Sequence, residues 1–113
     1  YREHARGEIA QYSEHVGISF SAQVSGSQIS GLMTVSNSGT RRILAMEISV
    51  LVPVAGEKTE VLRHMLGEKK GQELPPAPKR GRTAIVKVEH TLESVVRGSI
   101  EKPKITYLKF ADE

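Results

Sequence analysis

The feature that most constrains the fold is the stretch 31–54, GLMTVSNSGTRRILAMEISVLVPV, in which two alternating runs flank a polar turn. Before the turn, Ile29, Met33 and Val35 alternate with serine and threonine residues, which is the period of a strand that buries one face. After it, apolar residues occupy every second position from Leu44 to Val52 and several positions between them. We therefore expect two β-strands, of which the second is apolar enough to be central in a sheet.

The turn between these runs is Asn37-Ser38-Gly39. Asn bonds readily to its own backbone and Gly adopts a positive φ without steric cost, so the tripeptide favours a chain reversal. Two geometries are consistent with it, a hairpin within one sheet and a corner at which the chain crosses to a second sheet. Pro53 lacks an amide hydrogen, so we expect pairing to end there.

Further alternating segments predict strands over Gly17–Val24, from about Gln28, over Thr83–His90 and over Lys104–Phe110. Thr59–Leu66 fits a helical turn as well as a strand, and we favour the strand. Leu92–Ile100 fits either a helical turn or an irregular strand. Six or so short strands separated by turn signals indicate an all-β chain folded as a β-sandwich.

The first sixteen residues have a different period. Ala5, Ile9, Tyr12 and Val16 recur at helical spacing between charged residues, which predicts a connector helix over residues 1–16. The remaining residues, 17–113, are long enough for one domain and too short for two.

Several classes of chemistry are disfavoured by the sequence, which predicts a non-catalytic domain without metal or cofactor. The chain has no Cys, and its four histidines lie in separate segments without metal-ligand spacing. No Ser lies in a Gly-x-Ser-x-Gly motif, and the glycines are too dispersed to form a phosphate-binding loop. Glu89 and His90 are adjacent on a predicted strand, which directs them to opposite faces and disfavours a catalytic dyad.

The net charge of +3 is concentrated in one proline-rich segment, residues 67–82, which we expect to be an exposed loop. Its basic side chains outnumber Glu68 and Glu73 by three; they are Lys69, Lys70, Lys79, Arg80 and Arg82. These five are the candidate partner-binding residues, for an acidic protein or an anionic membrane surface. Pro75 to Arg80 also matches the Pro-x-x-Pro-x-Arg pattern that SH3 domains bind. Nucleic acid is a weaker candidate because the loop holds no aromatic residue for base stacking.

Four sequence segments together resemble bacterial immunoglobulin-like domains. They are Val35-Ser36-Asn37-Ser38-Gly39, the apolar run Leu44 to Val52, Leu74-Pro75-Pro76, and the ending Tyr107 to Asp112. The ending looks like the last strand of such domains in uncharacterised, actinobacterial-like membrane-associated proteins. The resemblance implies an immunoglobulin-like antiparallel β-sandwich with a short N-terminal helix, attached to a membrane through a segment outside this chain. It implies no catalytic or binding residues, and the disulfide and core Trp of antibody domains are absent.

The functional expectation is a non-catalytic interaction or structural module of a larger, membrane-anchored protein. Its protein partner would bind a sheet edge or the basic loop at 67–82. One alternative is a ligand-sensing regulatory domain, which requires a cavity; another is a weak nucleic-acid-binding module, whose affinity would fall steeply with salt. The identity of the partner, the side of the membrane and the oligomeric state remain open at this stage.

Overall fold

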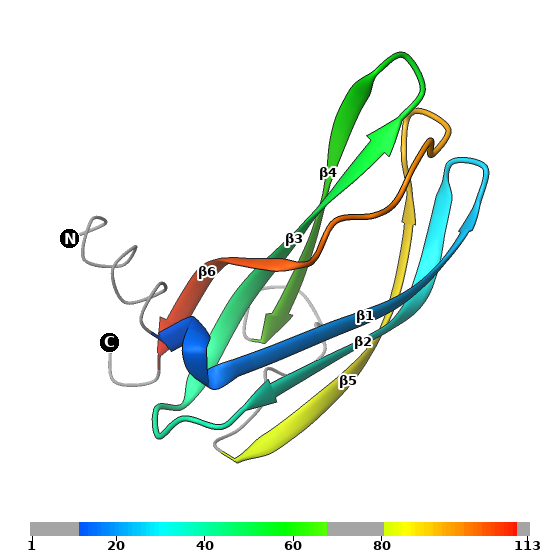
Figure 1. The fold of residues 1–113 in the computed structure, drawn as a ribbon. Coiled ribbons are helices and arrows are strands. Elements are labelled where there is room, and N and C mark those ends of the chain that lie inside the picture. The colour runs from blue at the N-terminus through cyan, green and yellow to red at the C-terminus, as the bar shows by residue number, and fades with distance from the viewer. Residues whose placement is uncertain (1–11, 68–80, 111–113) are drawn as a thin grey trace.

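The computed structural model describes residues 12–67 and 81–110. These residues form a short 3-10 helix and six strands, coloured along the chain in Figure 1. The elements are η1 (Ser13–His15), β1 (Val16–Ser25), β2 (Gln28–Asn37), β3 (Ile43–Val54), β4 (Lys58–Gly67), β5 (Arg82–Thr91) and β6 (Lys104–Phe110). The predicted all-β class is confirmed, and the strand over Lys104–Phe110 has the predicted bounds.

The strands form two antiparallel three-stranded sheets, in the orders β1-β2-β5 and β4-β3-β6. Figure 1 shows the sheets as two facing layers, and one apolar core joins them. The central strands supply most of this core, because the inward-facing Met33 and Val35 of β2 and Ile48 and Val50 of β3 are completely buried. The arrangement is therefore β-sandwich-like.

The link after Asn37 is a corner, which resolves the two geometries that the sequence left open. β2 ends at Asn37 in one sheet, and β3 begins at Ile43 in the other. β1 and β2 instead form a hairpin closed by Gly26 and Ser27, and β3 and β4 form a second hairpin in the other sheet. The strand predicted over Thr59–Leu66 is confirmed as β4.

The segment after β5 is neither helix nor regular strand. Leu92–Ile100 has one isolated bridge, between Val96 and Val54, and its backbone bonds to the ends of other strands. The amide of Leu92 donates to the carbonyl of Ser27 at 2.7 Å, and that of Arg97 donates to the carbonyl of Pro53 at 2.8 Å. This connection therefore bridges the hairpin ends of both sheets.

Pairing of β3 does not end at Pro53 as expected, since Pro53 pairs with Thr59 and the ladder continues to Val54. The Pro53 carbonyl accepts a hydrogen bond from Arg97, on the side away from β4. The N and C=O of one residue in a strand point to the same side, so the missing amide hydrogen also faces away from β4. The proline therefore costs the β3–β4 ladder nothing.

A register shift in β6 corrects another expectation. Strict alternation places Ile105 on the same face as Tyr107, opposite Leu108 and Phe110. In the structure the pairing of β6 with β3 shifts by one residue: Tyr107 lies opposite Glu47, and Ile105 lies opposite the next residue of β3, the inward-facing Ile48. Ile105 consequently packs against the core, whereas Tyr107 stays exposed. An irregularity of this kind moves one residue to the other face.

The predicted N-terminal helix lies mostly on residues 1–11, outside the described residues. In the described remainder of that segment Tyr12 is helical and Ser13–His15 form a 3-10 turn, whereas Val16, expected in the helix, is the first residue of β1. At the 67–82 loop, Gly67 belongs to β4 and Arg82 to β5. No helix within residues 12–67 and 81–110 is long and apolar enough to span a bilayer.

Candidate functional site

The edge strands differ in how well they are protected against pairing with another chain. Among residues 12–67 and 81–110, β1 pairs only with β2, over ten residues without a register shift, and it contains no charged residue and no proline. The other edge strands carry several charges each, and β6 has register shifts as well. Charges and irregularities are the usual means by which edge strands avoid adding a further strand. β1 lacks both.

The unpaired backbone groups of β1 can be assigned from its hairpin. The two-residue turn Gly26-Ser27 closes on the pair Ser25 and Gln28, and beyond the other end of the ladder Ser38 donates to the carbonyl of His15 at 2.8 Å. Hydrogen-bonded pairs alternate along an antiparallel ladder, so the odd-numbered residues of β1 bond to β2. The free edge therefore presents the amides and carbonyls of the even-numbered residues, Val16, Ile18, Phe20, Ala22 and Val24.

The side chains of these same residues point toward the core but are incompletely covered. Val16, Ile18, Phe20 and Ala22 are all partly exposed. On the edge strands β4 and β5 the inward-facing Leu62, Leu66, Val86 and Val88 are at most 3% exposed. β1 is the edge of its sheet, and Figure 1 shows it running along the front of the molecule. The edge of β1 thus combines unpaired backbone with accessible apolar surface.

Most of the basic residues predicted to bind a partner, Lys69, Lys70, Lys79 and Arg80, fall outside the described residues. The fifth, Arg82, is exposed and begins β5, where it pairs with Asn37 of β2. The basic site as a whole therefore stays a prediction.

A buried polar cluster fixes the chain where η1, the β2–β3 corner and the end of β6 meet. The Tyr12 hydroxyl donates to Asn37 Oδ1 at 2.6 Å and accepts from the Arg41 amide at 3.2 Å. Asn37 is 1% exposed; its Nδ2 donates to the Arg41 carbonyl at 3.0 Å, and its Oδ1 also accepts from the Gly39 amide at 3.1 Å. The Tyr12 ring packs edge-on against Phe110. These mutual bonds identify the cluster as structural.

A second polar contact, which is partly buried, lies on the opposite side of the sandwich. His64 of β4 and His90 of β5 meet across the two sheets, with 3.2 Å between His64 Nδ1 and His90 Nε2. Their rings are edge to face, with centroids 5.5 Å apart. In contrast to the Tyr12 cluster, this pair is incompletely bonded, because His64 Nε2 is buried and makes no hydrogen bond with any described residue.

Both imidazoles are harder to protonate than an imidazole in water. Burial lowers the pKa of His64, and the neighbouring His90 lowers it further. Burial also lowers the pKa of His90. Of the residues that the structure describes, no group of three or more His, Cys, Asp or Glu side chains could hold a metal ion. The chemistry that the pair itself supplies is the uptake and release of protons.

The sequence located both histidines but missed their contact. The opposite orientations of Glu89 and His90 are as expected, since Glu89 is exposed and His90 is partly buried. The alternation of residues does place both histidines on inward faces. His64 lies between Leu62 and Leu66 at every second position of β4, so it shares their inward face. His90 likewise continues the inward series of Val86 and Val88. Which strands face each other across the sandwich is a property of topology that this signal does not contain.

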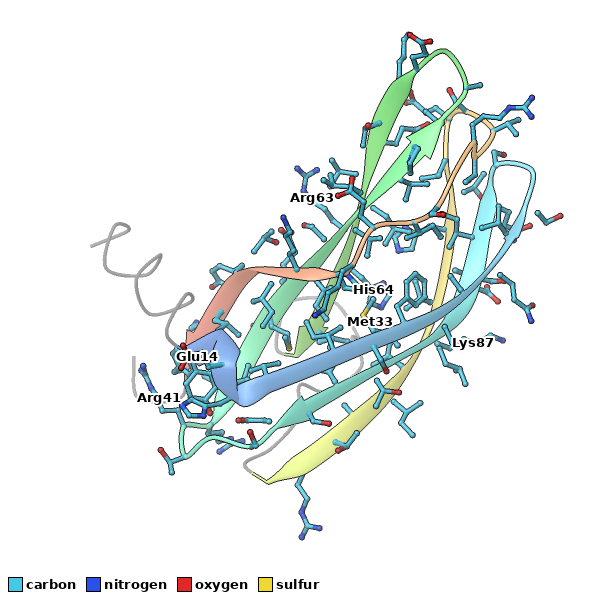
Figure 2. All side chains as sticks on the ribbon, in the orientation of Figure 1. Glu14, Met33, Arg41, Arg63, His64 and Lys87 are labelled. Atoms are coloured by element: carbon cyan, nitrogen blue, oxygen red, sulfur yellow. The ribbon has the colours of Figure 1, made fainter. Side chains whose placement is uncertain are left out.

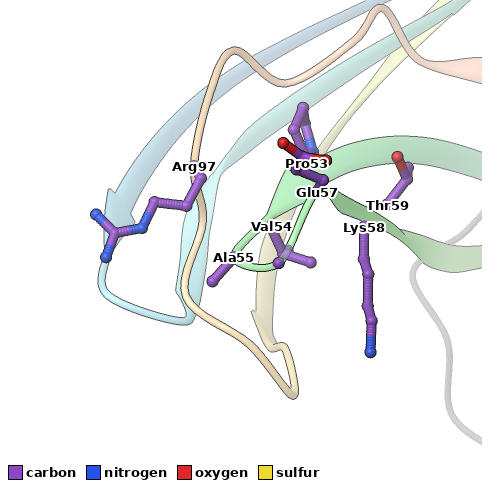
Figure 3. A pocket seen from close by; sticks show the side chains of 8 residues that line it. Pro53, Val54, Ala55, Glu57, Lys58, Thr59 and Arg97 are labelled. Atoms are coloured by element: carbon purple, nitrogen blue, oxygen red, sulfur yellow. The ribbon is translucent and has the colours of Figure 1, made fainter.

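A hollow at the β3–β4 hairpin is lined by residues 53–59 and Arg97. Figure 3 shows the side chains of Arg97 and Lys58 pointing away from each other, so the two cations do not converge on a shared ligand. The hollow is open to solvent, whereas a ligand-sensing domain needs an enclosed cavity. Ligand sensing therefore stays a prediction without a described site.

A scan against protein-family models gave no match, and searches of curated proteins and of solved structures gave none either.

Proposed function

We propose that this chain is a non-catalytic, immunoglobulin-like interaction domain that binds a partner polypeptide by strand addition along β1. The observation that carries the proposal is the combination found on that strand: ten regularly paired residues, no charge, and incompletely covered apolar side chains. Addition of a partner strand would satisfy the outward backbone groups and bury apolar surface in the same step.

The order of the strands supports the immunoglobulin-like part of the proposal. Immunoglobulin sandwiches place strands A, B and E in one sheet and C and F in the other, and variable domains add C′ beside C. The sheets β1-β2-β5 and β4-β3-β6 correspond to A-B-E and C′-C-F. The corner between β2 and β3 then corresponds to the B–C crossing between sheets.

The chemistry of β1 defines the partner strand. Ser19, Ser21 and Gln23 face outward and Ile18, Phe20 and Ala22 face inward, so an added strand finds no charge with which to pair. The favoured partner is an extended, uncharged segment in which small polar residues alternate with apolar residues. Its apolar residues would extend the inner face of the β1-β2-β5 sheet.

A synthetic peptide with the sequence of β1, flanked by lysines for solubility and fluorescently labelled, has the required pattern and serves as the probe. We expect saturable binding to the domain, measured by fluorescence anisotropy. Ala22→Pro removes one outward amide hydrogen and leaves the ladder to β2 intact. It should weaken binding by about tenfold or more, the effect of losing one hydrogen bond together with a steric block.

The matched control is Ile85→Pro, which removes an outward amide hydrogen from the other edge of the same sheet. Ile85 is 69% exposed and lies opposite Thr34 of β2. The backbone groups of the odd-numbered residues of β2 face β5 and bond to its even-numbered residues, so the amide and carbonyl of Ile85 point away from β2. Peptide affinity should be unchanged in this variant. Equal weakening by both variants, or none by Ala22→Pro, would contradict the assignment to β1.

The basic segment provides the second control. Replacing Lys69, Lys70, Lys79, Arg80 and Arg82 by Ser removes the charge predicted to attract an acidic partner and should leave binding of the peptide unchanged. If this variant alone loses the peptide, the interaction belongs to the basic segment and the proposal for β1 is wrong.

The parent protein, in this proposal, is membrane-anchored, as the resemblance of the sequence to domains of membrane-associated proteins implies. The test is the hydropathy of the reading frame around this chain. A run of about twenty apolar residues would support anchoring, and its absence from the complete frame would exclude a membrane-spanning helix.

A further inference from the structure

On the side of the sandwich opposite β1, the edge strands β4 and β5 face each other. His64 lies on the inward face of β4 between Leu62 and Leu66, and His90 lies on the inward face of β5 beyond Val88. Figure 2 places His64 between the two layers. The contact of 3.2 Å between His64 Nδ1 and His90 Nε2 therefore joins one sheet to the other.

The number of protons on the pair decides whether this contact is attractive. A neutral imidazole has one N–H donor and one acceptor nitrogen, and a protonated imidazole has two donors and no acceptor. With no proton or one extra proton on the pair, one of the two facing nitrogens can still accept. With both rings protonated, two N–H groups face each other at hydrogen-bonding distance, and two positive charges repel.

The His64 Nε2 atom adds a second penalty. It is buried without a hydrogen-bond partner among the described residues, so a proton placed there on the charged ring points at no acceptor. A buried, unpaired donor on a charged group is costly. Protonation of His64 is therefore unfavourable even before His90 is charged.

Among the described residues, no carboxylate bonds to either histidine to offset these penalties. Glu60 is the carboxylate on the inward face of β4, and both of its oxygens accept backbone hydrogen bonds, from Glu93 at 3.1 Å and from Ser94 at 2.9 Å. Glu89 points to the other face of β5, where it lies 3.5 Å from Lys87. The residues paired with the two histidines on the central strands are Ile48 of β3 and Ile29 of β2, which are apolar.

We propose that His64 and His90 form an acid-operated latch that holds β4 and β5 together while both imidazoles are neutral and releases them when both are protonated. The lowered pKa of each histidine agrees with this arrangement. Because the unfolded chain binds protons more readily than the folded one, the latch stabilises the domain above the unfolded pKa of about 6.5. This stabilisation is lost as the pH falls from there toward the folded pKa values.

The latch acts on a different side of the molecule from the proposed peptide-binding edge and does not depend on it. Opening would separate the edges of the two sheets at Leu62, Leu66, Val86 and Val88, which are otherwise buried. The newly exposed surface is apolar. At acidic pH the two sheets would thus separate along the β4–β5 side.

The test compares the wild type with the double variant His64→Gln/His90→Gln by thermal unfolding between pH 8 and pH 5. Gln keeps a hydrogen-bonding side chain and does not titrate. The Tm of the wild type should fall by about 5 °C between pH 7.5 and pH 5, and that of the double variant should fall much less. His15→Gln, at an exposed histidine whose ring packs edge-on against Tyr12, is the matched control; loss of that contact should lower its Tm equally at every pH, so its fall in Tm between pH 7.5 and pH 5 should equal that of the wild type.

Hydrogen exchange locates the effect. Between pH 7 and pH 5, after correction for intrinsic exchange rates, protection should fall first at residues 62–66 and 86–90 and remain at Met33 and Val35. If the double variant does not fold, NMR titration of the wild-type imidazoles provides the same test. Parallel loss of Tm in the wild type and the double variant, uniform loss of protection, or two histidines that titrate near 6.5 would each overturn the latch.

Discussion

The two long sides of this sandwich are closed in different ways. On one side β4 and β5 bury Leu62, Leu66, Val86 and Val88 and meet through His64 and His90, whose contact is conditional on protonation. On the other side, closure by β1 and β6 is strongest at one end, where Tyr12 packs against Phe110 and bonds to Asn37. Along the rest of that side, β1 is incompletely covered.

The number of hydrogen bonds that a polar group makes differs between these two sides, and with it the role that we assign to the group. At the corner, Asn37 is 1% exposed and is bonded through both Oδ1 and Nδ2, and none of these bonds involves a histidine or a carboxylate. His64 has one nitrogen unbonded among the described residues, so its contact responds to a proton. β1 has a whole row of outward backbone groups, and this makes it the edge suited to a partner.

The largest expected effect is from Asn37→Ala, which removes the centre of the corner cluster. The substitution leaves the Tyr12 hydroxyl, the Gly39 amide and the Arg41 carbonyl without the bonds that Asn37 makes to them. We expect the free energy of unfolding to fall by roughly 3 kcal/mol, measured by urea denaturation. Ser36→Ala, which removes an exposed bond of 3.0 Å to Thr83, is the control and should cost under about 1 kcal/mol. Similar losses of unfolding free energy in both variants would contradict the view that the buried cluster contributes more than an exposed hydrogen bond.

The second-largest loss of stability is expected from Gly31→Ala on β2, which would push β1 away from its neighbour. A Cβ at Gly31 would collide with the backbone oxygen of Ser21, so β1 would have to move away from β2. We expect a loss of about 2 kcal/mol and faster hydrogen exchange in the odd-numbered residues of β1. At Gly17, which lies on β1 itself, an added Cβ meets only Ser36 Cβ, at 3.9 Å, so Gly17→Ala is the matched control. Unchanged exchange in β1 of the Gly31 variant would contradict this packing.

Tyr12→Phe removes only one hydroxyl from the corner and so separates the contribution of its hydrogen bonds from that of its ring. Its ring contact with Phe110 is kept, whereas the bonds to Asn37 Oδ1 and the Arg41 amide are lost. The expected loss in the free energy of unfolding is about 1–2 kcal/mol, independent of pH between 5 and 8. A pH-dependent loss would indicate that the corner, and not the histidine pair, carries the response to acid.

The smallest effect is expected from Lys87→Ala on the outer face of β5. Its ion pair with Glu89 spans 3.5 Å between highly exposed side chains. Such pairs contribute little in water, so the change should stay within about 0.5 kcal/mol by the same denaturation assay. A loss above about 1 kcal/mol would show that the closed side depends on this surface charge as well as on its buried contacts.

The alternation of apolar and polar residues predicted the strands because it records which face of each strand is buried. The same local pattern carried no information on which strands pair, so it left the Asn37 turn open between a hairpin and a corner. The bulge that turns Ile105 inward depends on its pairing with β3, which alternation in one strand does not reveal. The exposed edge of β1 and the contact of His64 with His90 both follow from sheet order and so required the structure.

An NMR titration of the ¹⁵N-labelled domain with the β1 peptide shows directly whether β1 is the binding edge. We expect the amides of Ile18, Phe20 and Ala22 to shift and become protected from exchange, while the amides of Ser19 and Ser21, already bonded to β2, keep their protection. Resonances of β5 and of residues 67–82 should hardly move. Shifts centred on residues 67–82 or on β5, with β1 unaffected, would contradict this expectation.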